Sequence, residues 1–489
     1  MRGTSKSNKP EARMSRPLSS PVRLLLLAAS LTASLAQAPP ANAANPASEQ
    51  GASEAKAILA DLLALDTSSS HGTVNAVELL RKRFMAAGFP SADLAVVSKP
   101  DEPSQTSLVV RIHGQGRGKP LLYLCHLDVV PANPRDWTVP PYAMTEKDGW
   151  IYGRGSLDMK GEDSNVAAAL LRLRRESYKP ARDIVVAFTP DEESGGQRGV
   201  GWLLREHRDL IDAGLVLNPD SGSPAFRNGK RAFYGVQTSE KTYVTFSVEA
   251  SDRGGHSSEP RPDNAIYELT AALNKLAAYR FPINLTETVR AFYAAQAKFE
   301  SGARQADMRA VGNGDQAAAE RLAADPTDNA QVRTTCVATM LEAGHAENAL
   351  PQKARATIQC RMIPSDTQEN VQAALEQTFA DPALKITISR PANSGPESPP
   401  SAAIMSTYKR VVDSLWPGLT VMPSMDAGAS DSKFTRAVGI PSYGAASIFY
   451  DLEDMRAHGQ DERIKADRFA EGSEFAYRLM KAFGSNASL

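Results

Sequence analysis

The stretch Leu121-Leu122-Tyr123-Leu124-Cys125-His126-Leu127-Asp128 joins a short apolar run to a histidine and an aspartate. A run of this length and character predicts a buried strand. Two later apolar runs end in acidic groups in the same way: 184–188 leads to Asp191-Glu192-Glu193, and 215–217 leads to Asp220. Ligands of open α/β sheets collect at the carboxyl ends of the strands. We therefore expect these three strand ends to meet in one crevice.

The segments around these strands alternate between helix and strand patterns. The apolar spacing predicts that residues 49–88 are mostly helical, and 165–176 is an alanine- and leucine-rich helical segment. A strand is predicted at 107–113 and a helix at 200–206. Such alternation predicts an α/β fold in which a mostly parallel sheet is flanked by helices on both faces.

The pattern changes near Gly235. Val244, Phe246 and Val248 alternate with more polar residues, which predicts a half-exposed, antiparallel strand at 241–249. We interpret the middle block as an inserted α+β domain, with further elements at 264–278, 354–363 and 368–379, peripheral helices at 290–330 and a return linker at 391–400. The predicted segments are 1–43 (signal peptide), 44–236 (catalytic domain, first part), 237–392 (inserted lid domain) and 393–489 (catalytic domain, second part).

The first 43 residues have the pattern of a secretory signal peptide. Basic residues precede the apolar run 24–35, and Ala41-Asn42-Ala43 has the small-x-small form of a cleavage site. An uncleaved anchor or a disordered tail is the alternative. We expect an exported protein, periplasmic or secreted, with no membrane attachment after removal of the signal.

Composition excludes some partners. The 489 residues carry a formal net charge of -1, so no basic field favours nucleic acid or an anionic membrane surface. The three cysteines are too sparse for a disulfide framework, and Cys125 and Cys360 are expected to be buried small residues. Cys125 as a catalytic nucleophile is the alternative.

Several of the acidic and histidine residues suit a metal site. His126 and Asp128 are two apart and share one side of an extended strand, which fits an imidazole ligand oriented by a carboxylate. Asp158 lies between glycines, where an unusual backbone path is possible, although a helix cap is the alternative. Glu192 and Glu193 are adjacent, so one can bind metal while the other moves a proton. His458 precedes a glycine, which indicates a loop.

Taken in order, the motifs resemble a known family. They are His126-Leu127-Asp128-Val129-Val130-Pro131, Asp136-Trp137, Tyr152-Gly153-Arg154-Gly155 and Asp158-Met159-Lys160-Gly161. The chain resembles the aminoacylase, carboxypeptidase and succinyl-diaminopimelate desuccinylase family of metallohydrolases. It is most similar to the carboxypeptidase S (Gly-Xaa carboxypeptidase) and N-acyl-amino-acid hydrolase branch. The resemblance implies a phosphorylase/hydrolase-like zinc peptidase domain with an inserted lid.

The resemblance also implies a role for each motif residue. One zinc ion would be held by His126, Asp158 and Asp220, and the other by Asp158, Glu193 and His458, with Asp158 bridging. Glu192 would be the general base, and Asp128 the partner of His126. The peptide bond after Asp158 would be cis. Cobalt or manganese suits the same donors.

Substrate contacts are implied for the lid and for one catalytic loop. His256 would stabilise the developing oxyanion, often across a dimer interface. Asn348 and Arg361 would bind substrate, the arginine through the free carboxylate. Gly428 and Ser430 resemble the family's small-residue loop near that carboxylate, although Ala429-Ser430 stands where many relatives have Gly-Thr.

These features predict hydrolysis of an amide bond adjacent to a free carboxylate, with two zinc ions, as a carboxypeptidase or dipeptidase. An N-acyl-amino-acid amidohydrolase is the alternative, and a catalytically dead binding protein of the same fold is the non-enzyme alternative. The partner would be a small peptide or N-acyl amino acid, and the lid could form a homodimer.

Overall fold

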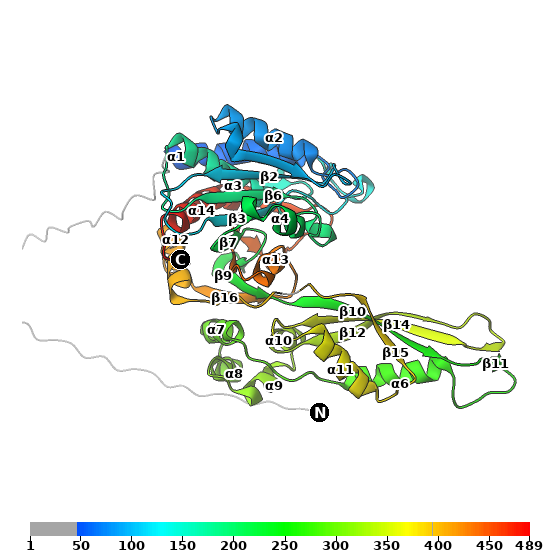
Figure 1. Cartoon of the computed structure of the whole chain (residues 1–489). Helices are drawn as coiled ribbons and strands as arrows, with labels where there is room; N and C mark the ends of the chain where they lie inside the picture. Colours follow the sequence, from blue (N-terminus) through cyan, green and yellow to red (C-terminus); the bar gives the residue numbers. More distant parts are fainter. Residues whose placement is uncertain (1–45, 394) are drawn as a thin grey trace, which may run out of the picture. The chain divides into compact units, whose positions relative to one another are not determined.

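The three strand ends belong to one six-stranded sheet with the order β1-β2-β6-β3-β7-β17 (Figure 1). The computed structural model describes residues 46–393 and 395–489, so the predicted signal segment lies outside the described residues. The sheet contains β1 (Leu94–Ser98), β2 (Thr106–Ile112), β3 (Leu121–His126), β6 (Ile184–Thr189), β7 (Leu215–Asn218) and β17 (Ser442–Gly444). The strands β6, β3, β7 and β17 are parallel neighbours, whereas β1 and β2 are antiparallel. The predicted parallel sheet is therefore mixed at one edge.

Helices bury both faces of this sheet. Tyr123 and Cys125 of β3 face a core formed with α1 (Pro46–Leu63), α2 (Val74–Ala86), α3 (Lys160–Arg175) and α14 (Ala466–Gly484). Leu122 and Leu124 face a second core with α4 (Val200–Glu206) and α13 (Ser432–Ala437). Because successive strand side chains point to opposite faces, a strand buried on both sides is a continuous apolar run. This packing explains the sequence of β3.

Helix α3 begins earlier than the sequence predicts, at Lys160 rather than at residue 165. Gly161 lies in its first turn, where glycine lowers helix propensity. A Cβ atom at Gly161 would lie 2.3 Å from the Ser156 carbonyl oxygen, so the close packing of this turn requires glycine. The loop 153–159, which contains Asp158, therefore leads directly into a buried helix.

Two smaller sheets in the same part of the chain were not predicted from sequence. One has the order β16-β9-β8-β18, and the other β19-β5-β4. Their strands are β8 (Ser223–Arg227), β9 (Lys230–Glu240), β16 (Val421–Asp426), β18 (Tyr450–Asp451), β4 (Thr145–Lys147), β5 (Trp150–Tyr152) and β19 (Arg463–Lys465). They lie beside the loops that carry Asp158 and His458.

The middle of the chain forms a four-stranded sheet, β12-β14-β10-β15, with its own core. It contains β10 (Thr242–Ser251), β12 (Thr335–Ala343), β14 (Lys353–Met362) and β15 (Lys385–Arg390), together with α6 (Ala265–Ala278) and α11 (Gln368–Phe379). Burial alternates along β10, as expected for a sheet with one covered face. The described residues cluster as one compact unit, and the boundaries at 236 and 392 stay a prediction.

Residues 287–332 are helical, as predicted. They form α7 (Glu287–Gln296), α8 (Gly302–Gly312), α9 (Gln316–Leu322) and α10 (Pro326–Val332). Their core includes Val289, Tyr293 and Val311, and it packs against Met425 of β16 and Ile363 after β14. No helix within 46–393 or 395–489 has both the length and the apolar character needed to cross a membrane.

The expectation about the cysteines is wrong for one pair. Cys336 of β12 lies directly opposite Cys360 of β14 in the antiparallel register, and the two form a disulfide. The two cysteines are 24 residues apart in sequence, and only the pairing of β12 with β14 brings their thiols together, which a count of cysteines cannot predict. Cys125 is a free, buried thiol, as expected.

Candidate metal centre

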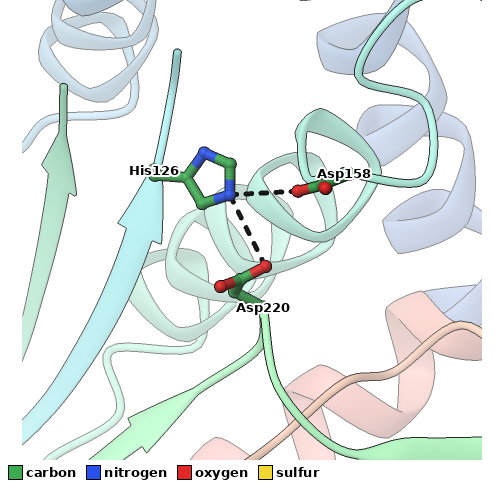
Figure 2. A group of neighbouring side chains, drawn as sticks. All are labelled: His126, Asp158 and Asp220. Carbon is green, nitrogen blue, oxygen red and sulfur yellow. Dashed lines mark hydrogen bonds and ion pairs between the residues drawn. The ribbon is translucent and has the colours of Figure 1, made fainter. Parts of the chain in front are cut away.

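Strand ends and loops bring five predicted ligands to one place. His126 is the last residue of β3, Asp220 follows β7, and Glu193 follows β6. Asp158 lies in the loop before α3, and His458 in the loop between β18 and β19. Figure 2 shows His126, Asp158 and Asp220 pointing toward one another. The convergence expected at the carboxyl ends of the parallel strands is therefore observed.

The first group surrounds the Nε2 atom of His126. This atom lies 3.1 Å from Asp158 Oδ1 and 3.5 Å from Asp220 Oδ1. One ligand atom from each of the three side chains lies within 4.8 Å of the other two. His126 is 2% exposed, so the group is shielded from bulk solvent on this side.

The second group surrounds the Nε2 atom of His458. This atom lies 3.1 Å from Asp158 Oδ2 and 2.9 Å from Glu193 Oε2. Asp158 thus offers one carboxylate oxygen to each group, which is the arrangement of a bridging ligand between two metal ions about 4 Å apart or less. Imidazole and carboxylate donors in groups of three, with a shared carboxylate, fit a dinuclear site for Zn²⁺, Co²⁺ or Mn²⁺.

The electrostatics of the cluster also favour a cation. Burial opposes a charged imidazole at His126, but Asp128, Asp158 and Asp220 outweigh it and raise its pKa well above the usual value. Hydrogen bonds that His458 donates to Asp158 and Glu193 raise the pKa of His458 to about 10. These shifts mean that the surrounding carboxylates stabilise positive charge at both imidazoles. The same carboxylates would stabilise the positive charge of a pair of metal ions.

Asp128 holds both the first imidazole and the turn that carries the two glutamates. The Nδ1 atom of His126 lies 3.0 Å from the Asp128 carbonyl oxygen and 3.6 Å from its Oδ1 atom. The Asp128 carboxylate accepts the backbone N–H groups of Glu192 and Glu193, each at 3.1 Å. Asp128 is therefore a positioning residue, and the carbonyl is the nearer partner of the imidazole.

A buried glutamate missed in the sequence fixes the loop of Asp158. The Glu462 carboxylate accepts backbone N–H groups of Gly155, Leu157 and Asp158 at 2.8–3.0 Å, and it pairs with Arg154 Nη1 at 2.6 Å. The Asp158–Met159 peptide bond is cis, as the family resemblance implied. Glu462 lies four residues after His458, so one short segment supplies a ligand and supports another. An acidic residue beside a predicted ligand was the available signal.

Glu192 points away from Glu193, as their adjacency predicts. Glu193 contacts His458, whereas Glu192 Oε1 lies 3.8 Å from the Nζ atom of Lys433. Burial first, and the charge of Asp220 second, raise the pKa of Glu192 well above its usual value. A carboxyl group of this kind suits proton transfer near neutral pH. Lys433, in the first turn of α13, was not predicted, and its only signal is a lysine shortly after the small residues 427–430.

The lid residues do not all reach this cluster. His256 lies on β11 (Gly255–His256), is exposed, and bonds through Nδ1 to the Ser258 hydroxyl at 2.7 Å. Within the described chain it makes no contact with any of the five candidate ligands. Asn348 lies beside it, because its carbonyl accepts the Ser257 N–H at 3.1 Å. His256 and Asn348 therefore lie near each other, and among the residues that the structure describes neither is hydrogen-bonded to a candidate ligand.

Arg361, at the end of β14, reaches the loop that contains Gly428. Its Nη1 atom lies 3.4 Å from the Ala427 carbonyl oxygen. Gly428 faces open space, since a Cβ atom there would meet nothing within 4 Å. The Ser430 hydroxyl donates to buried Glu240 at 2.7 Å, which anchors this loop, and its contact with substrate stays a prediction.

Comparison with known proteins identifies a family of peptidases and related amide hydrolases. The family model described as Peptidase family M20/M25/M40 matches residues 122–482 of this chain. The N-fatty-acyl-amino acid synthase/hydrolase PM20D1 of Xenopus tropicalis is 27% identical over 377 residues, which cover 74% of this chain and 72% of that protein. Mouse aminoacylase-1 is 26% identical over 425 residues, 85% of this chain and 91% of the relative. The probable carboxypeptidase S-like 2 of Dictyostelium discoideum is 28% identical over 382 residues, 74% and 71% of the two chains.

Solved structures share the fold at lower identity. The M20 family metallo-carboxypeptidase Sso-CP2 from Sulfolobus solfataricus superposes with a TM-score of 0.64 at 14% identity, over 88% of this chain and 99% of that one. Human carnosine dipeptidase 1 superposes with a TM-score of 0.58 at 16% identity, over 90% and 98%.

Proposed function

This chain belongs to Peptidase family M20/M25/M40, and on that premise we propose that it is a dizinc hydrolase of the amide bond beside a free carboxylate. The observation that carries the proposal is Asp158, whose two carboxylate oxygens face His126 and His458 at 3.1 Å each. A carboxylate shared in this way is the central feature of a two-metal site. The proposal commits to carboxypeptidase or dipeptidase activity.

The residues of the chain divide the reaction between them. The groups His126, Asp158, Asp220 and Asp158, Glu193, His458 would hold the two metal ions, which would supply a water of lowered pKa and polarise the scissile carbonyl. Glu192 takes the proton of the attacking water on its carboxylate and returns it to the leaving nitrogen. Arg361 binds the free carboxylate of the substrate through its planar fork of donors. His256, supplied by the other chain of the proposed lid dimer, donates to the oxygen on which negative charge develops.

An N-acyl amino acid is the alternative substrate. The relatives include an N-fatty-acyl-amino acid hydrolase, an aminoacylase and a carboxypeptidase S-like protein, and all of these names concern an amide next to a carboxylate. The two substrate types differ only in what lies on the acyl side of the bond. Rates on matched pairs, such as Gly-Leu against N-acetyl-Leu and N-palmitoyl-Leu, therefore decide between them.

The decisive experiment is a panel of dipeptides and N-acyl amino acids tested on metal-loaded protein. We expect hydrolysis that is lost in Glu192→Gln while both metal ions remain bound. Metal binding without hydrolysis of any member would instead support a binding protein of the same fold. Arg355, an exposed residue of β14 that pairs with Glu342, offers a matched control through Arg355→Gln.

The cysteine-hydrolase alternative conflicts with the environment of Cys125. This thiol is fully buried in the core of the main sheet, and burial raises its pKa well above the usual value. A nucleophilic cysteine needs an accessible thiolate. We expect activity to survive a thiol reagent and to be lost on chelation of the metal.

Export to the periplasm or the medium is part of the proposal. The disulfide Cys336–Cys360 supports it, because such bonds persist mainly in oxidising compartments. Cell fractionation checks the location, and mass spectrometry of the purified protein under non-reducing conditions checks the bond. A protein found in the cytoplasm with three free thiols would contradict this part.

A homodimer through the lid is also proposed. Strand β12 lies at an edge of the lid sheet, and its Val337, Met340 and Leu341 side chains are 59–61% exposed. An exposed apolar edge strand favours pairing with another chain. Light scattering after gel filtration measures the mass, and a monomer at micromolar concentration would contradict the dimer.

A further inference from the structure

A cavity of about 200 Å³ lies next to the proposed general base and has no role in the mechanism above. Tyr243 and Arg390 line it from the lid, and Lys433 lines it from the catalytic part. Ser194, Gly195 and Gln197 complete it from the turn that carries Glu192 and Glu193. Two of its lining residues are therefore cations.

Lys433 is a buried cation that has an ion pair but no hydrogen-bonded anion in the described part of the chain. The residue is 7% exposed, and its Nζ atom makes no hydrogen bond within 46–393 or 395–489. Its nearest carboxylate oxygen, Glu192 Oε1, is 3.8 Å away, which exceeds hydrogen-bond length. A buried ammonium group that lacks a hydrogen-bonded anion is unfavourable. An anion in the adjoining cavity would supply the missing partner.

Arg390, an exposed residue at the end of β15, brings a second set of donors to the same cavity. No hydrogen bond or ion pair of its guanidinium occurs among the described residues, and the group lies 4.6 Å from the centre of the Tyr243 ring. Its Nη2 atom is 3.7 Å from where a Cβ atom would stand on Gly195, so it lies over the turn of the two glutamates. The planar fork of an arginine matches a carboxylate in two parallel hydrogen bonds.

Arg361 lies close to this pair. Its guanidinium is 5.2 Å from the same Tyr243 ring, so both arginines contact one aromatic side chain. Under the proposed function Arg361 binds the carboxylate next to the scissile amide. The site assigned to the α-carboxylate and the cavity therefore share the Tyr243 side chain.

We propose that the cavity lined by Tyr243, Arg390 and Lys433 binds a second carboxylate of the substrate, that of an aspartate or glutamate side chain. This inference rests on the proposed function, because it assigns the α-carboxylate to Arg361. The enzyme then prefers to release an acidic amino acid, from N-acyl-glutamate or from a dipeptide ending in glutamate. Glutamine, which has the same shape without the charge, is the matched poor substrate.

The test compares N-acetylglutamate with N-acetylglutamine on the metal-loaded full chain. We expect wild type to favour the glutamate substrate in kcat/KM by about tenfold or more, the effect of one hydrogen bond to a charged group. Arg390→Met should lower this ratio toward one. Arg390→Glu should move the preference to N-acetyllysine, a reversal that a merely structural arginine would not cause. Arg355→Met is the control and should keep the wild-type ratio.

Binding of the free products gives a readout that does not need turnover. Calorimetry should show glutamate binding more tightly than glutamine to wild type, and equally to Arg390→Met. Equal rates and equal binding for the two ligands in wild type would overturn the inference. An equal loss on both substrates in Arg390→Met would overturn it too, since the cavity would then hold the α-carboxylate. Failure of every substrate, with selective glutamate binding kept, would count against the proposed function alone.

Discussion

The Oε1 atom of Glu462 accepts the backbone N–H of Asp158 at 3.0 Å, across 304 residues of sequence. The segment that supplies His458 therefore also fixes the loop of the proposed bridging carboxylate. Glu462 is fully buried and paired with Arg154, so its charge is compensated without solvent. Supporting groups of this kind determine how well ligands are oriented for a metal.

Glu462→Gln should weaken metal binding by about 10–100-fold, because the amide cannot accept three backbone N–H groups and an arginine together. It should also lower the unfolding temperature, since Arg154 loses its buried partner. Metal affinity by competition with a chelating dye measures the first effect. Glu453→Gln, an exposed change in the same segment, is the control, and equal affinities in the two variants would refute this role.

The two adjacent glutamates should give opposite results when each is changed to glutamine. Glu192→Gln should bind two metal equivalents and lose about 100-fold to 10,000-fold in kcat, because only the proton acceptor is removed. Glu193→Gln should bind one equivalent less, because it contacts His458 in the second group. Metal analysis by mass spectrometry, paired with initial rates, separates them. A metal deficit in Glu192→Gln would reverse the assignment.

The separation of His256 from the candidate ligands predicts that one subunit completes the site of the other. His256→Ala and Glu192→Gln should each be inactive alone, yet a co-purified mixed dimer should recover activity at one of its two sites. The measurement is kcat per dimer for tandem-tagged heterodimers. Inactive heterodimers would mean that His256 acts within its own chain or not at all.

Lys241 links stability to pH. This lysine, between β9 and β10, donates to the carbonyl oxygens of Ala330 and Arg333 at 2.9 Å each. Burial lowers its pKa from 10.5 to about 8, so between these values the unfolded chain binds more protons than the folded chain. The free energy of unfolding of wild type should therefore rise with pH in this window.

Lys241→Met has no titratable group at this position, so comparison with wild type isolates the contribution of Lys241 to the pH dependence of stability. The stability of wild type relative to the variant should rise by about 2 kcal/mol from pH 7.5 to pH 10, and urea unfolding at the two pH values measures it. A difference between the two proteins that stays constant with pH would show that burial does not perturb this lysine.

The family, the amide-bond chemistry and the identity of the candidate ligands could be predicted from the sequence. The apolar runs that lead to His126, Glu193 and Asp220 predict both the sheet and its site. A parallel strand buried on both faces is apolar, and ligands collect at its carboxyl end. The alternation along β10 likewise predicted a sheet with one covered face. Each of these is a local pattern of a few residues.

Only the tertiary structure showed the contacts between distant segments. The pairing of β12 with β14 brings Cys336 to Cys360, and the burial of Glu462 sets the loop of Asp158. The approach of β15 to the glutamate turn makes Arg390 and Lys433 line one cavity. No local sequence pattern predicts these contacts. Their roles depend on register and burial, which the whole chain determines when its cores pack.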